Sequence, residues 1–126
     1  MIAYATTGVN DMDRSIAFYD AVLAPLGVAR GETSPTWTGY SRPGDRGALL
    51  FLTRPFDKGQ ATGGNGAMLA VLAPDRAGVD AFHAAALRTG GVCEGPPGVR
   101  LGMDPVFYAA YVRDPDGNKL CAFVRK

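Results

Sequence analysis

The chain has 126 residues, the length of one domain, and folding should bury roughly two thirds of the surface of the unfolded chain. Apolar residues at 47% and charged residues at 20% are ordinary for a globular protein, and 13 basic against 12 acidic residues leave a net charge of +1. No run of Lys or Arg is long enough to follow a nucleic-acid backbone, and no apolar stretch is long enough to span a membrane. We therefore expect neither nucleic acid nor a membrane as a partner.

The N-terminal segment MIAYATTGVN lacks both the basic leader and the long apolar core of a secretory signal. The chain contains two cysteines, Cys93 and Cys121. Without export, we expect both to be reduced thiols in a cytoplasmic protein.

The first half of the chain predicts a strand, a helix and three further strands. Residues 2–9 are the expected first strand, and Asn10 or Asp11 is the expected N-cap of the helix. Apolar residues then recur every four positions, and Gly27 ends the helix because it accepts a left-handed conformation. The later strands are expected over residues 28–32, 37–41 and 48–54.

The second half has the same predicted order. Residues 66–73 are the expected strand, the Pro-Asp pair at 74–75 is a helix start signal, and the Gly pair at 90–91 ends the helix. Residues 94–105 are expected to form a long loop, of the kind that often borders a ligand site. The strands that follow the helix are expected over residues 92–94, 106–113 and 118–124.

The two halves also resemble each other in sequence. The segment DMDRSIAFYDAVLAPLGV, from Asp11 to Val28, matches DRAGVDAFHAAALRTGGV, from Asp75 to Val92, at an offset of 64 residues. A shared start, a shared glycine stop and an offset near half the chain length favour duplication over chance similarity. We predict two βαβββ modules, residues 1–54 and 66–126, joined by a linker of residues 55–65 within one domain, 1–126.

The segment RDPDGNKLCAFV, from Arg113 to Val124, predicts the end of one strand, a tight turn and a second strand. Side chains alternate along a strand, so Cys121 and Phe123 share one face of the sheet. In a hairpin without a bulge, Ala110 lies opposite Cys121 and Tyr108 opposite Phe123.

In order and spacing, the paired modules and four sequence segments resemble the vicinal oxygen chelate superfamily, the glyoxalase, bleomycin-resistance and extradiol-dioxygenase group. The segments are GVNDMDRSIAFYDAVLAPLG, TRPFDKGQATGGNG, APDRAGVDAFHAAAL and FYAAYVRDPDGNKL, and the resemblance covers the whole chain. It implies an α+β fold in which two βαβββ modules with mixed, curved sheets face one another around a cup-like cavity, with the helices outside. It also implies a homodimer, and leaves open whether modules are exchanged between subunits.

In metal-using relatives of this kind, His, Glu or Gln side chains on the first and last strands of each module hold a divalent cation. The resemblance carries these positions to Tyr4, Leu49, Met68 and Cys121, and Tyr4 and Met68 are repeat mates at the offset of 64. A shifted register near Leu49 changes nothing, because residues 49–52 all lack a metal-binding group. We therefore expect no metal and no cofactor.

The resemblance then implies a protein that binds a small hydrophobic or aromatic molecule in this cavity. Tyr4 and Tyr108 would donate hydrogen bonds to the ligand. Trp37 would either stack on it or fill the interior of the sheet, and alternation alone does not choose between the two. The predicted ligand-binding residues are Tyr4, Trp37, Leu49, Met68, Tyr108, Cys121 and Phe123.

Two other function classes stay open. One is an enzyme, either a metal-dependent lyase, isomerase or dioxygenase with ligands elsewhere, or a metal-free enzyme that uses Asp104, Tyr108 or Cys121. A nucleophilic Cys121 needs a nearby base, and the only histidine, His83, is expected on the outer helix, so a buried apolar Cys121 is the simpler interpretation. The other class is a structural dimer whose cavity is filled by its own side chains.

Overall fold

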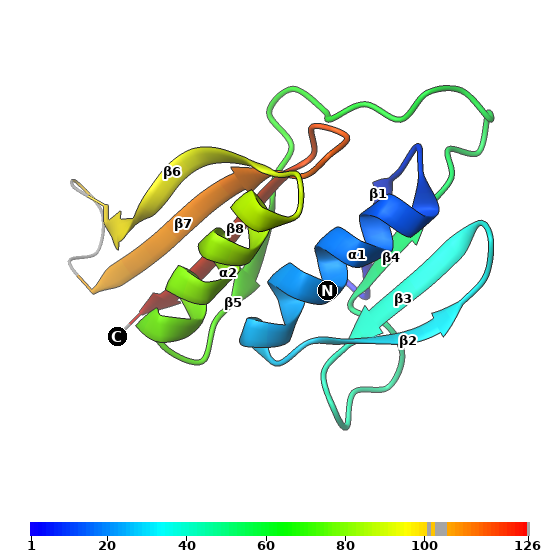
Figure 1. Ribbon diagram of the computed structural model, residues 1–126. Helices are drawn as coiled ribbons and strands as arrows, with labels where there is room; N and C mark the ends of the chain where they lie inside the picture. Colours follow the sequence, from blue (N-terminus) through cyan, green and yellow to red (C-terminus); the bar gives the residue numbers. More distant parts are fainter. Residues whose placement is uncertain (101, 103–105, 126) are drawn as a thin grey trace.

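The structure is a computed structural model that describes residues 1–100, 102 and 106–125. Two units of the same design follow each other along the chain, each with one strand, one helix and three more strands (Figure 1). In chain order the elements are β1 (Ala5–Gly8), α1 (Met12–Leu23), the short 3-10 helix η1 (Ala24–Leu26), β2 (Ala29–Thr33), β3 (Trp37–Ser41), β4 (Leu50–Thr53), β5 (Leu69–Leu72), α2 (Arg76–Arg88), β6 (Val92–Val99), β7 (Phe107–Arg113) and β8 (Lys119–Arg125).

Each unit forms its own four-stranded sheet. The first sheet has the order β1-β4-β3-β2 and the second the order β5-β8-β7-β6. In both, the outer first strand runs parallel to its neighbour and the other pairs are antiparallel, so the sheets are mixed. The predicted α+β fold of two βαβββ modules is therefore confirmed.

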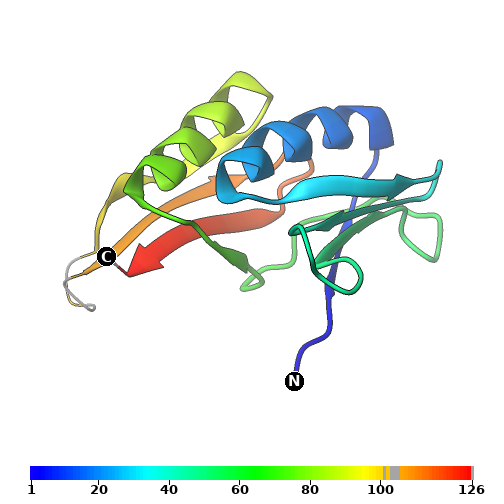
Figure 2. The same cartoon turned by 90° about the horizontal axis from the view of Figure 1, so that it is seen from below.

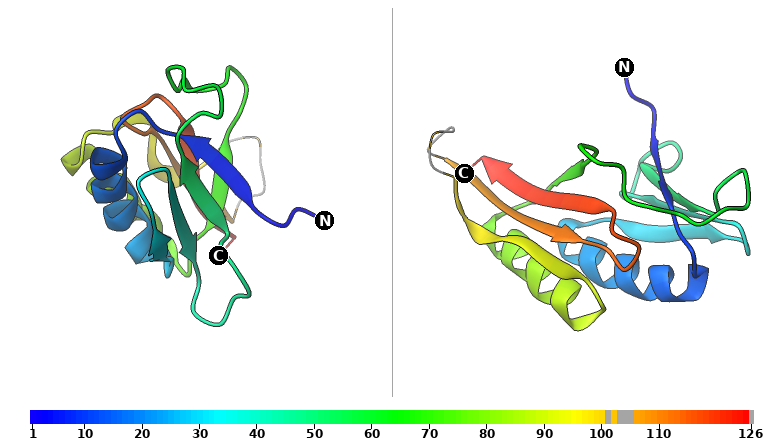
Figure 3. Two further views of the ribbon diagram at one scale, coloured as in Figure 1. Left: turned by 90° about the vertical axis from the view of Figure 1, so that its right-hand side faces the viewer. Right: turned by 90° about the horizontal axis from the view of Figure 1, so that it is seen from above.

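Both helices lie on the same side of the two sheets. Figures 2 and 3 show α1 and α2 in one layer on one side of the strands, and the two helices pack against each other. The core fills the space between this layer and the sheets, and its largest fully buried side chains are Tyr19, Tyr40, Phe18 and Phe82. We call the opposite, helix-free side of the two sheets the open face.

Alternation along β8 shows which residues belong to the open face. Leu120, Ala122 and Val124 are buried in the core beneath the helices. Cys121 and Phe123 therefore lie on the open face of the same strand, which confirms that they share a face.

The helix start signals act as predicted. The Asp11 carboxylate accepts a hydrogen bond from the backbone N of Arg14 at 3.1 Å, and the Asp75 carboxylate accepts one from the backbone N of Gly78 at 2.8 Å. Gly27 has a φ of 76° and ends the first helical segment, as predicted. No helix in the described part of the chain is both long and apolar enough to cross a membrane.

The prediction of a loop beginning at residue 94 is wrong, because β6 continues to Val99. This strand lies at the edge of the second sheet and pairs only with β7 among the described strands. Pro96 and Pro97 are tolerated there because an edge strand leaves one row of backbone N–H groups without a ladder partner. Irregular register between Cys93 and Gly98 accommodates them, as bulges do.

The predicted register of the β7–β8 hairpin is also wrong, by one residue. Tyr111, not Ala110, lies opposite Cys121, and Tyr108 lies opposite Val124. The cause is the turn, in which the backbone N of Asp114 donates to the carbonyl of Asn118 at 2.8 Å and leaves three residues between them. The predicted pairs require an even number of residues in the turn, so the observed odd number shifts every cross-strand pair by one residue relative to the prediction.

That same turn, residues 114–118, joins the two modules. The Asp116 carboxylate, which is 1% exposed, accepts hydrogen bonds from Asn10, Arg14 and Ser15 at the start of α1. The buried Asp114 accepts one from the Tyr19 hydroxyl at 2.6 Å. Burial, and after it the charge of Asp114, raises the pKa of Tyr19 well above its usual value, so Tyr19 stays a donor.

Two further hydrogen bonds join the modules, one donated by each module to the other. Asn118 donates from its Nδ2 atom to the carbonyl of Gly8 at 3.0 Å, and Arg42 donates from Nη2 to the carbonyl of Leu72 at 2.8 Å. Gly8 and Leu72 end β1 and β5 and are repeat mates at the offset of 64. Each module therefore bonds the end of the other module's first strand, which fixes the two sheets relative to each other.

We predict that Tyr19→Phe lowers the free energy of unfolding by about 1–3 kcal/mol, because the buried Asp114 Oδ2 loses one of its two donors, keeps only Asn118 Nδ2, and regains no water. Tyr40→Phe is the matched control: its hydroxyl donates to Asp20 at 2.8 Å, but Asp20 is 39% exposed and keeps Arg30 as a partner. Urea denaturation of both variants measures the difference. Equal losses would contradict the special role of the Tyr19–Asp114 pair.

Candidate functional site

The open face of the first sheet carries a row of three aromatic rings. Phe51 of β4 lies in the middle, with Tyr4 edge-on at 5.2 Å between ring centroids and Trp37 edge-on at 5.3 Å. Tyr4 is 53% exposed and Trp37 45% exposed, so both rings keep contact with solvent. Trp37 therefore does not fill the interior of the sheet. We call Tyr4, Phe51 and Trp37 the aromatic row.

A hollow of about 340 Å³ lies beside the aromatic row. Phe51 forms one wall, and a glycine on β3 makes the close approach possible. A Cβ atom at Gly39 would lie 3.1 Å from the Phe51 ring and 3.2 Å from the Cβ of Ala48, closer than side chains normally pack. The remaining lining residues are Gly31, Glu32, Ser41 and Gly47.

The open face of the second sheet also carries aromatic side chains, and here cationic side chains lie over the rings. Phe107 and Phe123 stack at 5.1 Å between centroids. The ring of Tyr111 lies beneath Arg100, whose Cζ is 5.0 Å from the ring centroid, and beneath Lys119, whose Nζ is 5.6 Å from it. Such cation–π contacts hold the charged groups against the face of the sheet.

Cys121 lies on this face and is only 1% exposed. Burial raises the pKa of its thiol to about 11, and the hydrogen bond with Tyr111 and the nearby charges of Arg100 and Lys119 only partly oppose this. The group is therefore a neutral thiol near pH 7. The outer-helix histidine does not activate it, because His83 Nε2 lies 3.2 Å from the sulfur of the exposed Cys93 instead. A nucleophilic Cys121 is not supported by this geometry.

The prediction that Tyr108 shares the face of Phe123 is wrong. Its shifted pairing with Val124 turns Tyr108 toward the helical layer, where its hydroxyl donates to Asp80 of α2 at 2.6 Å. That hydrogen bond is the main reason why the pKa of Tyr108 is raised, so the phenol is a weak proton donor. The structure places Tyr108 away from the other predicted ligand-binding residues.

The predicted position of Leu49 as the counterpart of Cys121 in the first module, implied by the four carried-over positions, is also wrong. In the parallel ladders, Thr6 lies opposite Phe51 and Ala70 opposite Cys121, so Phe51 is the repeat mate of Cys121. Leu49 instead packs against the hydrophobic core. With Phe51 in place of Leu49, the set of positions that the resemblance implies becomes Tyr4, Phe51, Met68 and Cys121.

This donor set does not fit a divalent metal ion. A phenol, a benzene ring, a thioether and a neutral thiol cannot replace the hydration of zinc, nickel, iron or manganese as imidazole and carboxylate do. Across residues 1–100, 102 and 106–125, no three His, Cys, Asp or Glu side chains come together to form a metal site.

A smaller hollow of about 180 Å³ lies at the seam between the modules, where β1 and β5 approach each other. Thr6 lines it from β1, Met68 from the residue that precedes β5, and Lys119 from β8. The seam thus brings a predicted ligand-binding residue, Met68, beside a cation of the second sheet.

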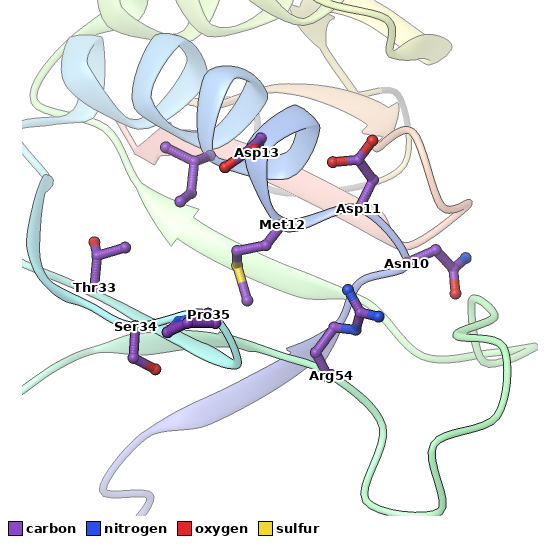
Figure 4. A pocket seen from close by; sticks show the side chains of 9 residues that line it. Asn10, Asp11, Met12, Asp13, Thr33, Ser34, Pro35 and Arg54 are labelled. Atoms are coloured by element: carbon purple, nitrogen blue, oxygen red, sulfur yellow. The ribbon is translucent and has the colours of Figure 1, made fainter.

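A larger, more open hollow of about 640 Å³ lies at the start of α1. Figure 4 shows Met12 and Arg54 pointing into it from α1 and from the end of β4. The Asp11 carboxylate at its rim is already engaged as the helix cap. None of the predicted ligand-binding residues lines this hollow, so we do not place the functional site here.

Several predicted residues do come together. Tyr4 and Trp37 contact Phe51 on the first sheet, and Cys121 and Phe123 occupy neighbouring open-face positions on the second. Asp104, the predicted general base, lies outside the described residues. Sequence reasoning missed Phe51, Tyr111, Arg100 and Lys119; the equivalence of Phe51 and Cys121 follows from the register of the parallel ladders, which the offset of 64 does not give because these two residues are 70 positions apart.

Comparisons with known proteins agree with this architecture. Residues 1–122 match the family model described as Glyoxalase/Bleomycin resistance protein/Dioxygenase superfamily. A glyoxalase/bleomycin resistance protein from Albidiferax ferrireducens T118 is 41% identical, with a TM-score of 0.87 over 100% of this chain and 99% of that one. A search of curated protein sequences found no match.

Two more distant structures share the fold. A glyoxalase-related enzyme from Fulvimarina pelagi is 22% identical, with a TM-score of 0.73 over 98% of this chain and 86% of that one. The fosfomycin resistance protein FosX from Mesorhizobium loti is 15% identical, with a TM-score of 0.69 over 100% of this chain and 92% of that one.

We predict that iodoacetamide at about pH 8 modifies Cys93 and spares Cys121 in the folded protein, because the buried thiol is neutral and covered. Peptide mass spectrometry separates the two sites, and labelling in urea is the control in which both react. In the unfolded chain the Cys121 thiol ionises at its ordinary pKa, which is lower than its pKa of about 11 in the folded protein. The folded state is therefore progressively destabilised, relative to the unfolded state, as the pH rises from that ordinary value toward 11. Equal labelling of both thiols in the folded state would contradict the assignment.

Proposed function

The chain belongs to the glyoxalase, bleomycin resistance protein and dioxygenase superfamily, and from this premise we propose that it binds a small hydrophobic or aromatic molecule on its open face. The proposed mechanism is sequestration, in which the ligand buries apolar surface against the sheets. No chemical step is assigned to the protein.

The aromatic row carries this proposal. Its rings meet edge to face, which leaves the solvent-facing sides of Tyr4 and Trp37 available for a flat ligand. Burial of such rings stabilises a complex by about 25 cal/mol for each Å² of apolar area. The adjoining hollow of about 340 Å³ is within the usual size range of small-molecule sites.

An enzyme is the less supported function. The family metal positions hold groups that do not fit a divalent metal, so we derive no metal-assisted step. A thiol mechanism lacks both a thiolate and a base at Cys121. Tyr108, another candidate catalytic group, is bound to Asp80 on the helical side.

We also propose an oligomeric state and a cellular location. The oligomer is a homodimer in which a second copy covers the part of the open face around Met68 and Leu72, whose large apolar side chains are about half exposed. We also propose a reducing cytoplasmic location, which the two free thiols support.

We predict that the neutral probe N-phenylnaphthylamine binds and quenches the fluorescence of Trp37, the only tryptophan of the chain. Phe51→Ala should weaken this binding by about tenfold, because the central ring of the aromatic row is lost. Phe56→Ala is the matched control, since Phe56 is fully exposed in the linker. Equal affinities of the two variants, or no binding at all, would contradict the proposed site.

We also predict that light scattering after size-exclusion chromatography gives twice the chain mass of 13.2 kDa. Leu72→Lys should shift the mass toward that of the monomer, because the exposed apolar side chain is replaced by a charge. Leu87→Lys, at a half-exposed leucine on α2, is the control that should remain dimeric. A monomeric wild type would contradict the dimer.

A further inference from the structure

We propose that the open face of the second sheet recognises the carboxylate of a small aromatic acid, with Arg100 and Lys119 as the groups that bind it. This inference rests on the proposed function and specifies its ligand class. The observation behind it is a set of three cations, Arg100, Lys119 and Arg125, gathered over three aromatic rings.

The pattern of β8 explains how the cations reach one face. Lys119, Cys121, Phe123 and Arg125 alternate along the strand, so all four side chains are on the open face. Arg125 lies over the Phe123 ring, with its Cζ 5.4 Å from the ring centroid. On the open face of β8, a positive charge at Lys119 and another at Arg125 therefore flank Cys121 and Phe123.

Arg100 joins this face from the end of β6 and is held in place. Its Nη2 atom donates to the carbonyl of Pro96 at 2.6 Å and to that of Ala109 at 2.9 Å, while the guanidinium lies over Tyr111. A Cβ atom at Gly95 would lie 3.0 Å from the Tyr111 ring and 3.2 Å from Nη2, so only glycine leaves room for this stack. A cation fixed in this way loses little entropy when an anion binds.

These cations differ from three arginines that are paired with carboxylates. Arg14 and Arg30 form ion pairs elsewhere in the protein, and Arg113, opposite Lys119 on the same sheet, pairs with Glu94. Within the described ranges Arg100 and Lys119 form no ion pair. Both groups lie against one ring, with Arg100 Cζ 5.0 Å and Lys119 Nζ 5.6 Å from the Tyr111 ring centroid. Two positive charges beside one aromatic ring on a partly buried surface favour an anion there.

The rest of the ligand can be inferred from the neighbours of Lys119. This side chain lines the hollow at the seam, together with Thr6 of β1 and Met68 just before β5. A carboxylate bound between Arg100 and Lys119 would leave the body of the ligand on Met68 and on the aromatic surface. A flat ring with one carboxylate fits both the charge and the apolar surroundings.

Two probes with the same ring separate charge from hydrophobicity: naphthoate, and naphthylmethanol with its substituent at the same ring position. Isothermal titration calorimetry at low salt should give naphthoate an affinity at least tenfold higher than that of the alcohol. In Lys119→Met, which keeps most of the side-chain length, the preference should fall to about threefold or less. Arg88→Met, which removes an equal charge from α2, is the control and should keep the wild-type preference.

Thermal unfolding of each variant confirms that it is folded before binding is measured. Equal affinities of wild type for the two probes would overturn the carboxylate inference and leave the proposed function standing. An equal loss of preference in Lys119→Met and Arg88→Met would also overturn it, because the overall charge would then be the cause. If neither probe binds, both this inference and the proposed function fail.

Discussion

The architecture depends on two buried carboxylates in one turn. Asp114 and Asp116 belong to the second module, yet Tyr19 donates to the first carboxylate, and Asn10, Arg14 and Ser15 to the second, from the first module. Donors within the turn also bind Asp114, but the side-chain donors to Asp116 come from the first module, so this buried carboxylate favours one docked arrangement. The result is a single helical layer on one side and two uncovered sheets on the other (Figure 2).

This arrangement divides the open face into two chemically different halves. The first sheet offers the aromatic row and a hollow without a cation among its lining residues. The second sheet carries aromatic rings that form cation–π contacts with Arg100, Lys119 and Arg125. A ligand that spans the seam would meet apolar surface on one side and positive charge on the other, which is the basis of the ligand class that we propose.

Duplication made most of the fold predictable, because the chain contains two copies of one pattern, 64 residues apart, in which a strand is followed by a helix that ends at a glycine. Local geometry limited the prediction of the site. An odd number of turn residues turned Tyr108 to the helical side, and the parallel ladder gave Phe51 the position expected for Leu49. The stack of Arg100 on Tyr111 depends on two strands and a bulged edge, so no local sequence pattern contains it.

The central claim is that the open face, and not the helical layer, receives an aromatic ligand. A titration of isotope-labelled protein with naphthoate, followed through backbone amide shifts in NMR spectra, tests it most directly. Our account predicts the largest shifts at Phe51, Met68, Tyr111 and Cys121, with α1 and α2 nearly unchanged. Shifts concentrated in the helices or around the hollow at the start of α1, with none on β4 and β8, would contradict it.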